Sequence, residues 1–385
     1  MYKLQFDPAV CASCTTVDCL VRCQYLGYGF EEARREKTAI LDGEKAKTLE
    51  ACVTCYACEE YCPNKNHPFY QIVERQEALG ILPAPVPLTK QQLRMMVPRG
   101  DATAQKVTKP VIDMCFFPML LGCIRGKLYE GVSTIAGSDI FCNIMWLHFA
   151  KNSVIRERLP KVIDTIQKYY LEDSGVDEII CFHDECYGTF THLAPAFGID
   201  VPFKSVHLFE YLAKKLEDLS KEIRPLNTKV AYQRPCSNRL IPETQHWVDD
   251  IFKKIGADRV EREYDRENAL CCGGVPRIHQ RDDLADDIQK KNIDDMENAG
   301  VQYCVFNCPA CLFTLGDAVS QRGIIPILMS DLCQLALAYL SIKECSYDRC
   351  SAKTGRHCRK GICIRTGRGT IYLLHGPGNN APRQT

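Results

Sequence analysis

The 385-residue sequence lacks an excess of charge of either sign, because 48 Lys and Arg residues balance 48 Asp and Glu residues. A chain without a strong positive field has no general electrostatic attraction for nucleic acids or anionic membrane surfaces. The sequence also lacks an apolar run of 18 or more residues, and its first 20 residues lack a signal-peptide pattern. We therefore expect a soluble, cytoplasmic protein without a transmembrane segment or a nucleic-acid partner.

Cysteine, in contrast, is abundant, with 24 residues in the chain. Disulfides are a poor explanation for so many thiols in a cytoplasmic protein, because that compartment keeps thiols reduced. Ligation of metal ions or iron–sulfur clusters explains them better. The chain is long enough for two or three domains with hydrophobic cores of their own.

The most specific pattern consists of five cysteines in the second half of the chain. A first cysteine is followed after 34 residues by an adjacent cysteine pair. Thirty-five residues, of which the first two are glycines, separate this pair from a C-x2-C pair. Five thiols are too many for a tetrahedral zinc site, and two adjacent cysteines reach two irons of a cluster more easily than one ion. The pattern therefore predicts a large iron–sulfur cluster. Its ligands would be Cys236, Cys271, Cys272, Cys308 and Cys311.

The first 80 residues contain two further runs of four cysteines, spaced C-x2-C-x4-C-x3-C and C-x2-C-x2-C-x3-C-P. The second run has the spacing of bacterial ferredoxins, in which the fourth cysteine of each run serves the other cluster. We therefore predict a ferredoxin-like domain over residues 1–80 with two 4Fe–4S cubane clusters that relay electrons; two zinc knuckles are the alternative. One cluster would bind Cys11, Cys14, Cys19 and Cys62, and the other Cys52, Cys55, Cys58 and Cys23.

After a proline-rich linker over 81–108, short β-type runs alternate with helical stretches. This alternation predicts two pseudo-repeated parallel α/β modules, over 109–225 and 226–342, so that the whole chain is a mixed α+β and α/β multidomain protein. Each module ends its ligand pattern with a pair of candidate ligands separated by two residues, His183 with Cys186 and Cys308 with Cys311. A serine follows 19 positions after the second member of each pair, and we expect Ser205 and Ser330 to begin corresponding helices. The expected strands are Val111–Met114, Glu178–Cys181, Val230–Tyr232 and Tyr303–Phe306, and the clearest helices cover 154–170 and 284–296.

The first module departs from the five-cysteine pattern. It has no adjacent cysteine pair, and a histidine replaces the first cysteine of its closing pair. Three interpretations stay open: a structural module without metal, a zinc or other mixed site, or an altered cluster. The candidate ligands are Cys123, Cys142, His183 and Cys186. Cys115 and Cys181 are expected to be packed core thiols, since free cysteine is among the most buried residue types.

Residues 343–385 form a basic tail with four more cysteines. They suit a zinc clip, a further cluster or a docking segment without metal. The four cysteines are Cys345, Cys350, Cys358 and Cys363.

The five-cysteine pattern resembles the CCG domain of the heterodisulfide reductase catalytic-subunit family. The resemblance implies a noncubane 4Fe–4S cluster that cleaves a disulfide. A two-cubane domain followed by a CCG module is also similar to the electron-transfer subunit of class II benzoyl-CoA reductase complexes, and the altered first module favours this second group. It implies anaerobic metabolism and, as partners, a flavin-containing heterodisulfide-reductase-A-like subunit, other electron-transfer subunits and a ferredoxin.

We therefore expect an oxidoreductase subunit that moves electrons through two cubanes to the noncubane cluster, which reduces a disulfide or acts as a relay. The alternatives are the iron–sulfur subunit of a 2-hydroxyacid or glycerol-phosphate dehydrogenase, which usually keeps two CCG modules, and a structural zinc protein. Four basic residues near the ligand loops are candidates for binding an anionic substrate or supplying a proton. They are Arg234, Arg239, Arg277 and His279.

Overall fold

The computed structural model describes residues 6–339, 363–367 and 370–374. Residues 6–80 form a head that contains helices and, in the described part, no strand. Short helices separated by turns suit this segment, because cysteines recur every few residues and leave little room for longer elements. The helices are α1 (Pro8–Ser13), α2 (Asp18–Val21), α3 (Phe30–Asp42), α4 (Lys47–Ala51), α5 (Ala57–Tyr61) and α6 (Pro68–Leu79).

Two four-stranded sheets follow, and every pair of neighbouring strands in them is parallel. Both sheets have the same order, in which the second strand along the chain lies outside the first, followed by the third and the fourth. The first sheet is β2 (Ser133–Ile135), β1 (Val111–Asp113), β3 (Glu178–Cys181) and β4 (Lys204–His207). The second is β6 (Ala257–Arg259), β5 (Thr228–Gln233), β7 (Tyr303–Phe306) and β8 (Ile325–Leu328).

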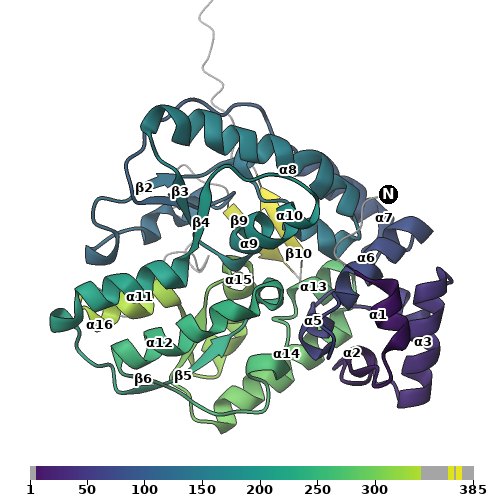
Figure 1. The fold of residues 1–385 in the computed structure, drawn as a ribbon. Helices are drawn as coiled ribbons and strands as arrows, with labels where there is room; N and C mark the ends of the chain where they lie inside the picture. The colour runs from purple at the N-terminus through teal and green to yellow at the C-terminus, as the bar shows by residue number, and fades with distance from the viewer. Residues whose placement is uncertain (1–5, 340–362, 368–369, 375–385) are drawn as a thin grey trace, which may run out of the picture.

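Helices connect the parallel strands, as crossover connections require. The first module contains α8 (Asn152–Ile166), α9 (Asp184–Gly188), α10 (Ala194–Ala196) and α11 (Leu208–Asp218). The second contains α12 (Gln245–Ile255), α13 (Gly274–Ile278), α14 (Asp282–Asn298), α15 (Pro309–Gln321) and α16 (Met329–Ala336). Figure 1 shows the first module above the second, with the head beside α13 and α14.

The expected strands coincide with the observed ones to within two residues at either end, because these runs are apolar and buried on both faces. One expectation was wrong. Ser205 lies inside β4, and its helix α11 begins only at Leu208, whereas Ser330 lies in the first turn of α16. A five-residue π-helical segment (Thr189–Leu193) and α10 lengthen the first module here, so equal spacing in sequence does not give equal structural positions.

The segment predicted as a linker is ordered against the first module. It contains α7 (Val86–Met95), and the Asp139 carboxylate then accepts hydrogen bonds of 2.8 Å from the backbone N–H groups of Gly100, Asp101 and Ala102. The segment therefore acts as a strap that links the head to the module that follows it.

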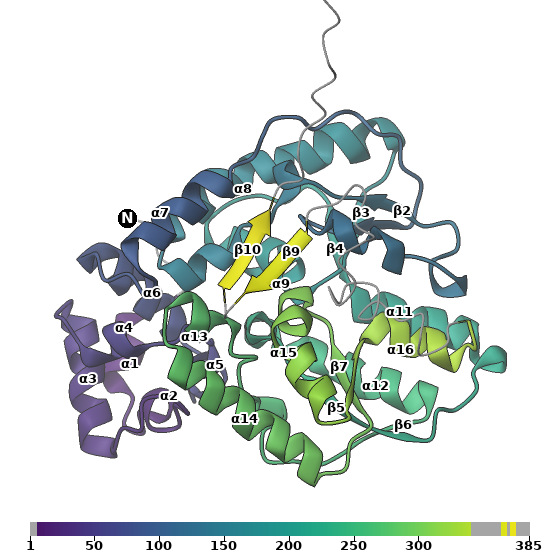
Figure 2. The same cartoon turned by 180° about the vertical axis from the view of Figure 1, so that it is seen from behind.

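One hydrophobic core cluster extends across both sheets, because it includes Ile112 and Ile180 of the first and Val230 and Val305 of the second. The two modules therefore share a hydrophobic interface. Figure 2 shows this contact from behind, where α11 packs against α12. The antiparallel strands β9 (Cys363–Gly367) and β10 (Thr370–Leu374) complete the described residues.

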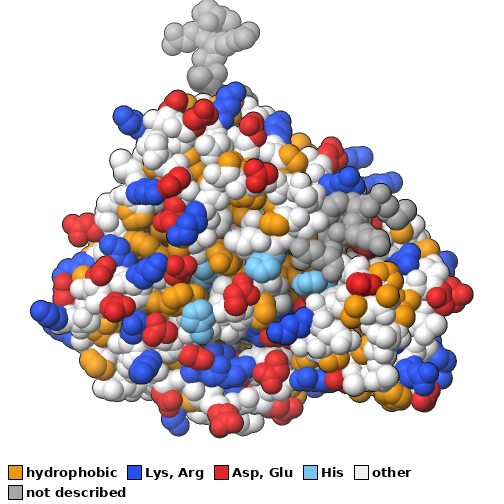
Figure 3. Space-filling model, in the orientation of Figure 1, with side chains coloured by type: hydrophobic (Ala, Val, Ile, Leu, Met, Phe, Trp, Pro, Cys, Tyr) orange, Lys and Arg blue, Asp and Glu red, His pale blue; other side chains and the backbone are white. Residues whose placement is uncertain are grey.

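Acidic and basic side chains alternate on the face seen in Figure 3, as the balanced composition leads one to expect. Among the described residues, no helix combines the length and the apolar character that crossing a bilayer requires.

Candidate functional site

Three loops of the second module gather the five cysteines of the predicted cluster. Each loop follows the carboxyl end of a parallel strand or the connection after it, which is where such sheets place their sites. Cys236 begins a 3-10 turn three residues after β5, the adjacent pair Cys271 and Cys272 precedes α13, and Cys308 and Cys311 lie at the N-terminus of α15. Four of the five are buried and Cys236 is half-buried.

These thiols lie close enough to control one another's protonation. Hydrogen bonds from Cys271 and Cys311 hold the pKa of Cys272 well below its usual value despite burial. Burial, and then the charges of Cys272 and other neighbours, raise the pKa of Cys236 well above its usual value. Several thiolates cannot remain charged together in this buried space without a cation, so the donor set fits a bound iron–sulfur cluster.

Two glycines leave room for close approach beside the cysteine pair. Gly273 has a φ of +87°, and a Cβ atom there would lie 2.9 Å from the side chain of Gln289. A Cβ atom at Gly274 would lie 3.1 Å from Thr314 Oγ1 and 3.5 Å from Cys272 Sγ. Gln289 in turn donates a hydrogen bond of 2.9 Å to the carbonyl of Cys272 and holds the loop. Both positions therefore favour glycine because a Cβ atom would be crowded there. Gly273 is favoured for a second reason, its positive φ.

The electrostatic influences among the head cysteines link several members of each predicted group. Burial and the charges of Cys62, Cys11 and Cys14 raise the pKa of Cys19. Burial and the charge of Cys55 raise the pKa of Cys23 to about 11, so the fourth cysteine of the first run faces the second run. Cys52 and Cys58 lie within the same electrostatic neighbourhood as Cys55. Ligation of a cluster by either group remains a prediction.

The head touches the five-cysteine site directly. The hydroxyl of Tyr25 accepts a hydrogen bond of 3.0 Å from the backbone N–H of Cys271, and the charge of Cys55 contributes, after burial, to the raised pKa of Tyr25. Cys55 likewise contributes to the raised pKa of Cys236. The second group of head cysteines is thus the one that adjoins the CCG-type loops.

Arg234 and Arg239 are not available to bind a substrate. This corrects the expectation that they bind an anionic substrate or supply a proton. Both guanidinium groups are buried and pair with the carboxylate of Glu60 in the head, at 2.7 Å and 2.6 Å. Arg239 also donates to the carbonyls of Glu267 and Ala269. These arginines therefore fasten the head to the second module.

The other two basic candidates are also engaged within the chain. Arg277 pairs with Asp282 and Asp286 on α14, and His279 is buried with its Nε2 atom 2.8 Å from the carbonyl oxygen of His148. Burial lowers the pKa of His279 to about 4, so this ring is not a cation at neutral pH.

His148 is a site residue that the sequence analysis missed. Its Nε2 atom lies 3.8 Å from Cys236 Sγ and its Nδ1 atom lies 2.8 Å from the hydroxyl of Thr54, between the head cysteines Cys52 and Cys55. His148 comes from a 3-10 turn (Ile144–Phe149) of the first module and belongs to no motif, so only the tertiary structure reveals it.

The candidate ligands of the first module also lie close together, except that Cys115 takes the place expected for Cys123. The ligand atoms of Cys115, His183 and Cys186 all lie within 4.8 Å of one another, and Cys142 donates its backbone N–H to Cys115 Sγ at 3.3 Å. Cys123 instead packs in the other core cluster, with Leu120 and Leu128. Cys115 is therefore not merely a core thiol. The signal that identifies it is its position just after the end of β1, because Cys236 likewise closely follows the end of β5. Cys181 is fully buried, as expected, and so are Cys304 and Cys333.

The remaining predicted ligands belong to the tail. Cys345, Cys350 and Cys358 lie outside the described residues, and Cys363 is described only as the first residue of β9.

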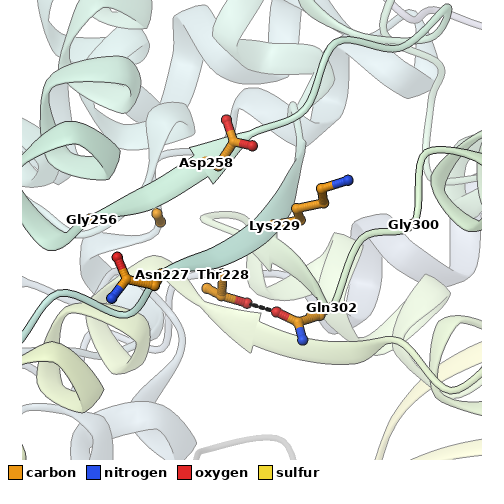
Figure 4. A pocket seen from close by; sticks show the side chains of 8 residues that line it. Asn227, Thr228, Lys229, Gly256, Asp258, Gly300 and Gln302 are labelled. Carbon is orange, nitrogen blue, oxygen red and sulfur yellow. Dashed lines mark hydrogen bonds between the residues drawn. The ribbon is translucent and has the colours of Figure 1, made fainter.

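A pocket of about 640 Å³ lies at the amino end of the second sheet, opposite the cysteines. Figure 4 shows its lining side chains, among them Thr228 and Gln302, which hydrogen-bond each other. Asn227, Lys229 and Asp258 point into solvent-accessible space there, and no cysteine lines the pocket. It is therefore separate from the candidate site.

Comparison with known proteins agrees with this site. Residues 230–316 match the CCG cysteine-rich domain family, and this range contains all five cysteines. A fumarate reductase (CoM/CoB) subunit of Methanothermobacter marburgensis is 20% identical over 79% of this chain and 63% of its own length. EtfAB:quinone oxidoreductase of Syntrophomonas wolfei is 28% identical over 74% of this chain and 45% of its own length.

A third relative is a subunit of a heterodisulfide reductase. A subunit of the ferredoxin:CoB-CoM heterodisulfide reductase of Methanosarcina acetivorans is 27% identical over 27% of this chain and 36% of its own length. The chain spans about half to three fifths of the length of the first two relatives. Residues 230–316 thus match a CCG cysteine-rich domain, and the chain is similar to iron–sulfur proteins of the heterodisulfide reductase type.

Proposed function

We propose that the chain is an iron–sulfur electron-transfer subunit that delivers electrons from its head to a disulfide-reducing centre in the CCG domain. Two 4Fe–4S cubanes would bind the two groups of head cysteines, and a noncubane 4Fe–4S cluster would bind the five cysteines of the second module. The observation that carries the proposal is the contact between the second head group and the five-cysteine loops, through Tyr25, Cys271 and Cys55.

The noncubane cluster would supply the redox chemistry for cleaving a disulfide, while the protein supplies position and electrostatics. Gln289 and Tyr25 hold the loop of Cys271 and Cys272, and the pair of Glu60 with Arg239 holds the segment that follows Cys236. Burial of four of the five cysteines limits the access of water to their sulfurs. The backbone N–H of Thr54 donates to Cys52 Sγ at 3.3 Å, and hydrogen bonds to ligand sulfurs tune cluster potentials.

The relatives support thiol and disulfide chemistry, since two of them are named for CoM and CoB. We propose that the chain works in a multi-subunit flavin-dependent reductase of anaerobic metabolism, of the benzoyl-CoA reductase type, with a flavin-containing heterodisulfide-reductase-A-like subunit and a ferredoxin as electron donors. A second candidate function is a relay without disulfide chemistry, which the similarity to an EtfAB:quinone oxidoreductase favours.

The proposal is tested by iron and acid-labile sulfide analysis of anaerobically purified protein, with EPR during addition of a disulfide. We expect about twelve irons per chain, four for each of three clusters, and a disulfide-dependent paramagnetic signal. Cys271→Ser should remove the signal and about four irons, and Cys304→Ser, a buried strand thiol outside the ligand loops, should retain both. About eight irons in the unmodified protein would refute the third cluster, and about twelve without the signal would leave the relay.

A further inference from the structure

We propose that Asp184 of the first module is a positioning residue for the five-cysteine centre of the second module, because its carboxylate holds two of the three ligand loops. Asp184 is the first residue of α9, and its side chain is fully buried. The inference rests on the proposed function, since these two loops are among those proposed to hold the noncubane cluster. It gives the first module a part in that function.

Both oxygens of this carboxylate accept hydrogen bonds from the second module. Oδ1 accepts from Asn238 Nδ2 at 2.6 Å, and Oδ2 accepts from Asn307 Nδ2 at 2.5 Å. Asn238 lies two residues after Cys236 in the first ligand loop, and Asn307 directly precedes Cys308 in the third. One side chain therefore fixes the spacing between these two loops.

Burial makes these contacts hard to replace. Asn238 is fully buried and Asn307 is 3% exposed, so water does not substitute for either amide. A buried carboxylate that lost one of these donors would be left with part of its charge uncompensated, which is costly in a protein interior. A displacement of either loop is therefore resisted by the same carboxylate.

The first module holds the carboxylate from another side. His207 Nδ1 accepts the backbone N–H of Phe209 at 3.1 Å, which leaves the ring proton on Nε2. This Nε2 atom lies 3.4 Å from Asp184 Oδ1, and the ring is buried. Asp184 is thus fixed by a side chain of its own module while it binds the two amides of the other.

Asn238 extends the network to the head. Its Oδ1 atom accepts from Arg234 Nε at 2.8 Å, and Arg234 pairs with Glu60 of the head at 2.7 Å. A continuous set of polar contacts therefore links the head, the first module and the ligand loops of the second module. The ligand loops are held relative to the donor head as well as to each other.

The sequence explains why this acceptor lies in the first module. The run His183-Asp184-Glu185-Cys186 follows β3 just as Cys308-Pro309-Ala310-Cys311 follows β7. Pro309, at the position that corresponds to Asp184, has no side-chain hydrogen-bonding group. The module that departs from the five-cysteine pattern thus contributes a carboxylate to the interface between the modules.

The test begins with Asp184→Asn in the full-length protein. This change keeps the shape of the side chain but leaves a single acceptor oxygen beside a new amide. That amide would face the Nδ2 atom of either Asn238 or Asn307, so at least one ligand loop loses its partner. Asp139→Asn is the matched control, because Asp139 is a buried carboxylate of the same module that holds the strap and not the ligand loops.

Hydrogen–deuterium exchange of the backbone, followed by mass spectrometry, reads out the positions of the loops. In Asp184→Asn, exchange should become at least about tenfold faster in 236–241 or 307–312, as expected for the loss of one charge-assisted hydrogen bond. Exchange in 271–278 should stay unchanged, because Gln289 and Tyr25 hold that loop. The control should leave all three segments unchanged.

The rate of disulfide reduction with an artificial electron donor reads out the centre itself. Loss of a residue that orients metal ligands typically lowers activity by about 10–100-fold, and we expect this loss in Asp184→Asn with the iron content retained. Combining Asp184→Asn with Asn307→Asp exchanges donor and acceptor, so the amide at position 184 donates to the carboxylate at position 307. Most of the lost exchange protection and rate should then return.

If Asp184→Asn does not fold, Asn307→Ser removes one partner only and should expose 307–312 while 236–241 stays protected. The inference would be overturned by unchanged exchange in both segments of Asp184→Asn, by equal changes in the Asp139→Asn control, or by a folded double variant that recovers nothing. Failure of the proposed function would show instead as about eight irons in the unmodified protein. The exchange pattern would still report whether Asp184 holds the loops.

Discussion

The Nε2 atom of His148 lies 3.8 Å from the sulfur of Cys236, and the other ring nitrogen of this histidine contacts Thr54 beside the head cysteines. Burial lowers the pKa of His148 to about 3, so the ring is neutral and carries one N–H. In the tautomer that carries its proton on Nε2, the Thr54 hydroxyl donates to Nδ1 and the Nε2 N–H faces Cys236 Sγ. The first module thus places a ring nitrogen beside Cys236, a candidate cluster ligand of the second module.

The first prediction concerns this hydrogen bond. His148→Ala should make the potential of the CCG centre more negative by on the order of 60 mV, because a reduced, more negatively charged centre loses a hydrogen bond of about 1.4 kcal/mol. EPR-monitored redox titration measures the shift. His192→Ala, at a half-exposed histidine of the same module, serves as control. Equal potentials in His148→Ala and unmodified protein would remove His148 from the site.

The second prediction concerns the attachment of the head. Glu60→Gln should destabilise the packing of head on second module by about 3–5 kcal/mol, because it leaves Arg234 and Arg239 buried without their counter-charge. Limited proteolysis at the head and the rate at which reduced head clusters pass electrons to the CCG centre report the change. Glu50→Gln, at an exposed glutamate of α4, should behave like the unmodified protein. If both variants resist protease equally, Glu60 does not hold the head.

The third prediction separates the two roles of Gly273. Gly273→Ala and Gly300→Ala both place alanine at positive φ, at +87° and +67°, which costs about 1–2 kcal/mol. Only the first also brings a Cβ atom to 2.9 Å from Gln289, whereas nothing lies within 4 Å of the second. We expect loss of cluster iron in Gly273→Ala alone, measured by iron content. Similar iron loss in both variants would attribute the effect to backbone strain.

The fourth prediction is a pH dependence in the head. A hydrogen bond to Glu59 at 2.7 Å raises the pKa of His67, although burial opposes it. Because the folded-state pKa exceeds the unfolded one, the stabilisation is complete below the unfolded pKa of about 6.5 and is lost as pH rises through the folded value. The thermal unfolding midpoint should therefore fall with rising pH in this window, by a small amount since the ring is about one third exposed.

The matched variant for this fourth prediction is His67→Gln, which cannot titrate. Its unfolding midpoint should change less over the same pH range than that of the unmodified protein. Parallel pH profiles would show that another group is responsible.

The strands were predictable because they are short apolar runs that carry their own signal, and Glu178–Cys181 and Tyr303–Phe306 agree with the structure at both ends. The different positions of Ser205, inside β4, and Ser330, in the first turn of α16, were not predictable. The π-helical segment inserted before β4 leaves no regular pattern in the sequence.

The sequence by itself identified most of the candidate ligand cysteines, because the spacing of thiols along a chain limits the clusters that they can bind. The tertiary structure decided which groups meet: Cys115 in place of Cys123, His148 against Cys236, and Arg234 and Arg239 on Glu60. The reason is that these partners are far apart in sequence, and only the packing of two parallel sheets and the head brings their polar atoms within a few ångströms. Spacing is a property of the chain, whereas the pairing of buried charges and ligands is a property of the fold.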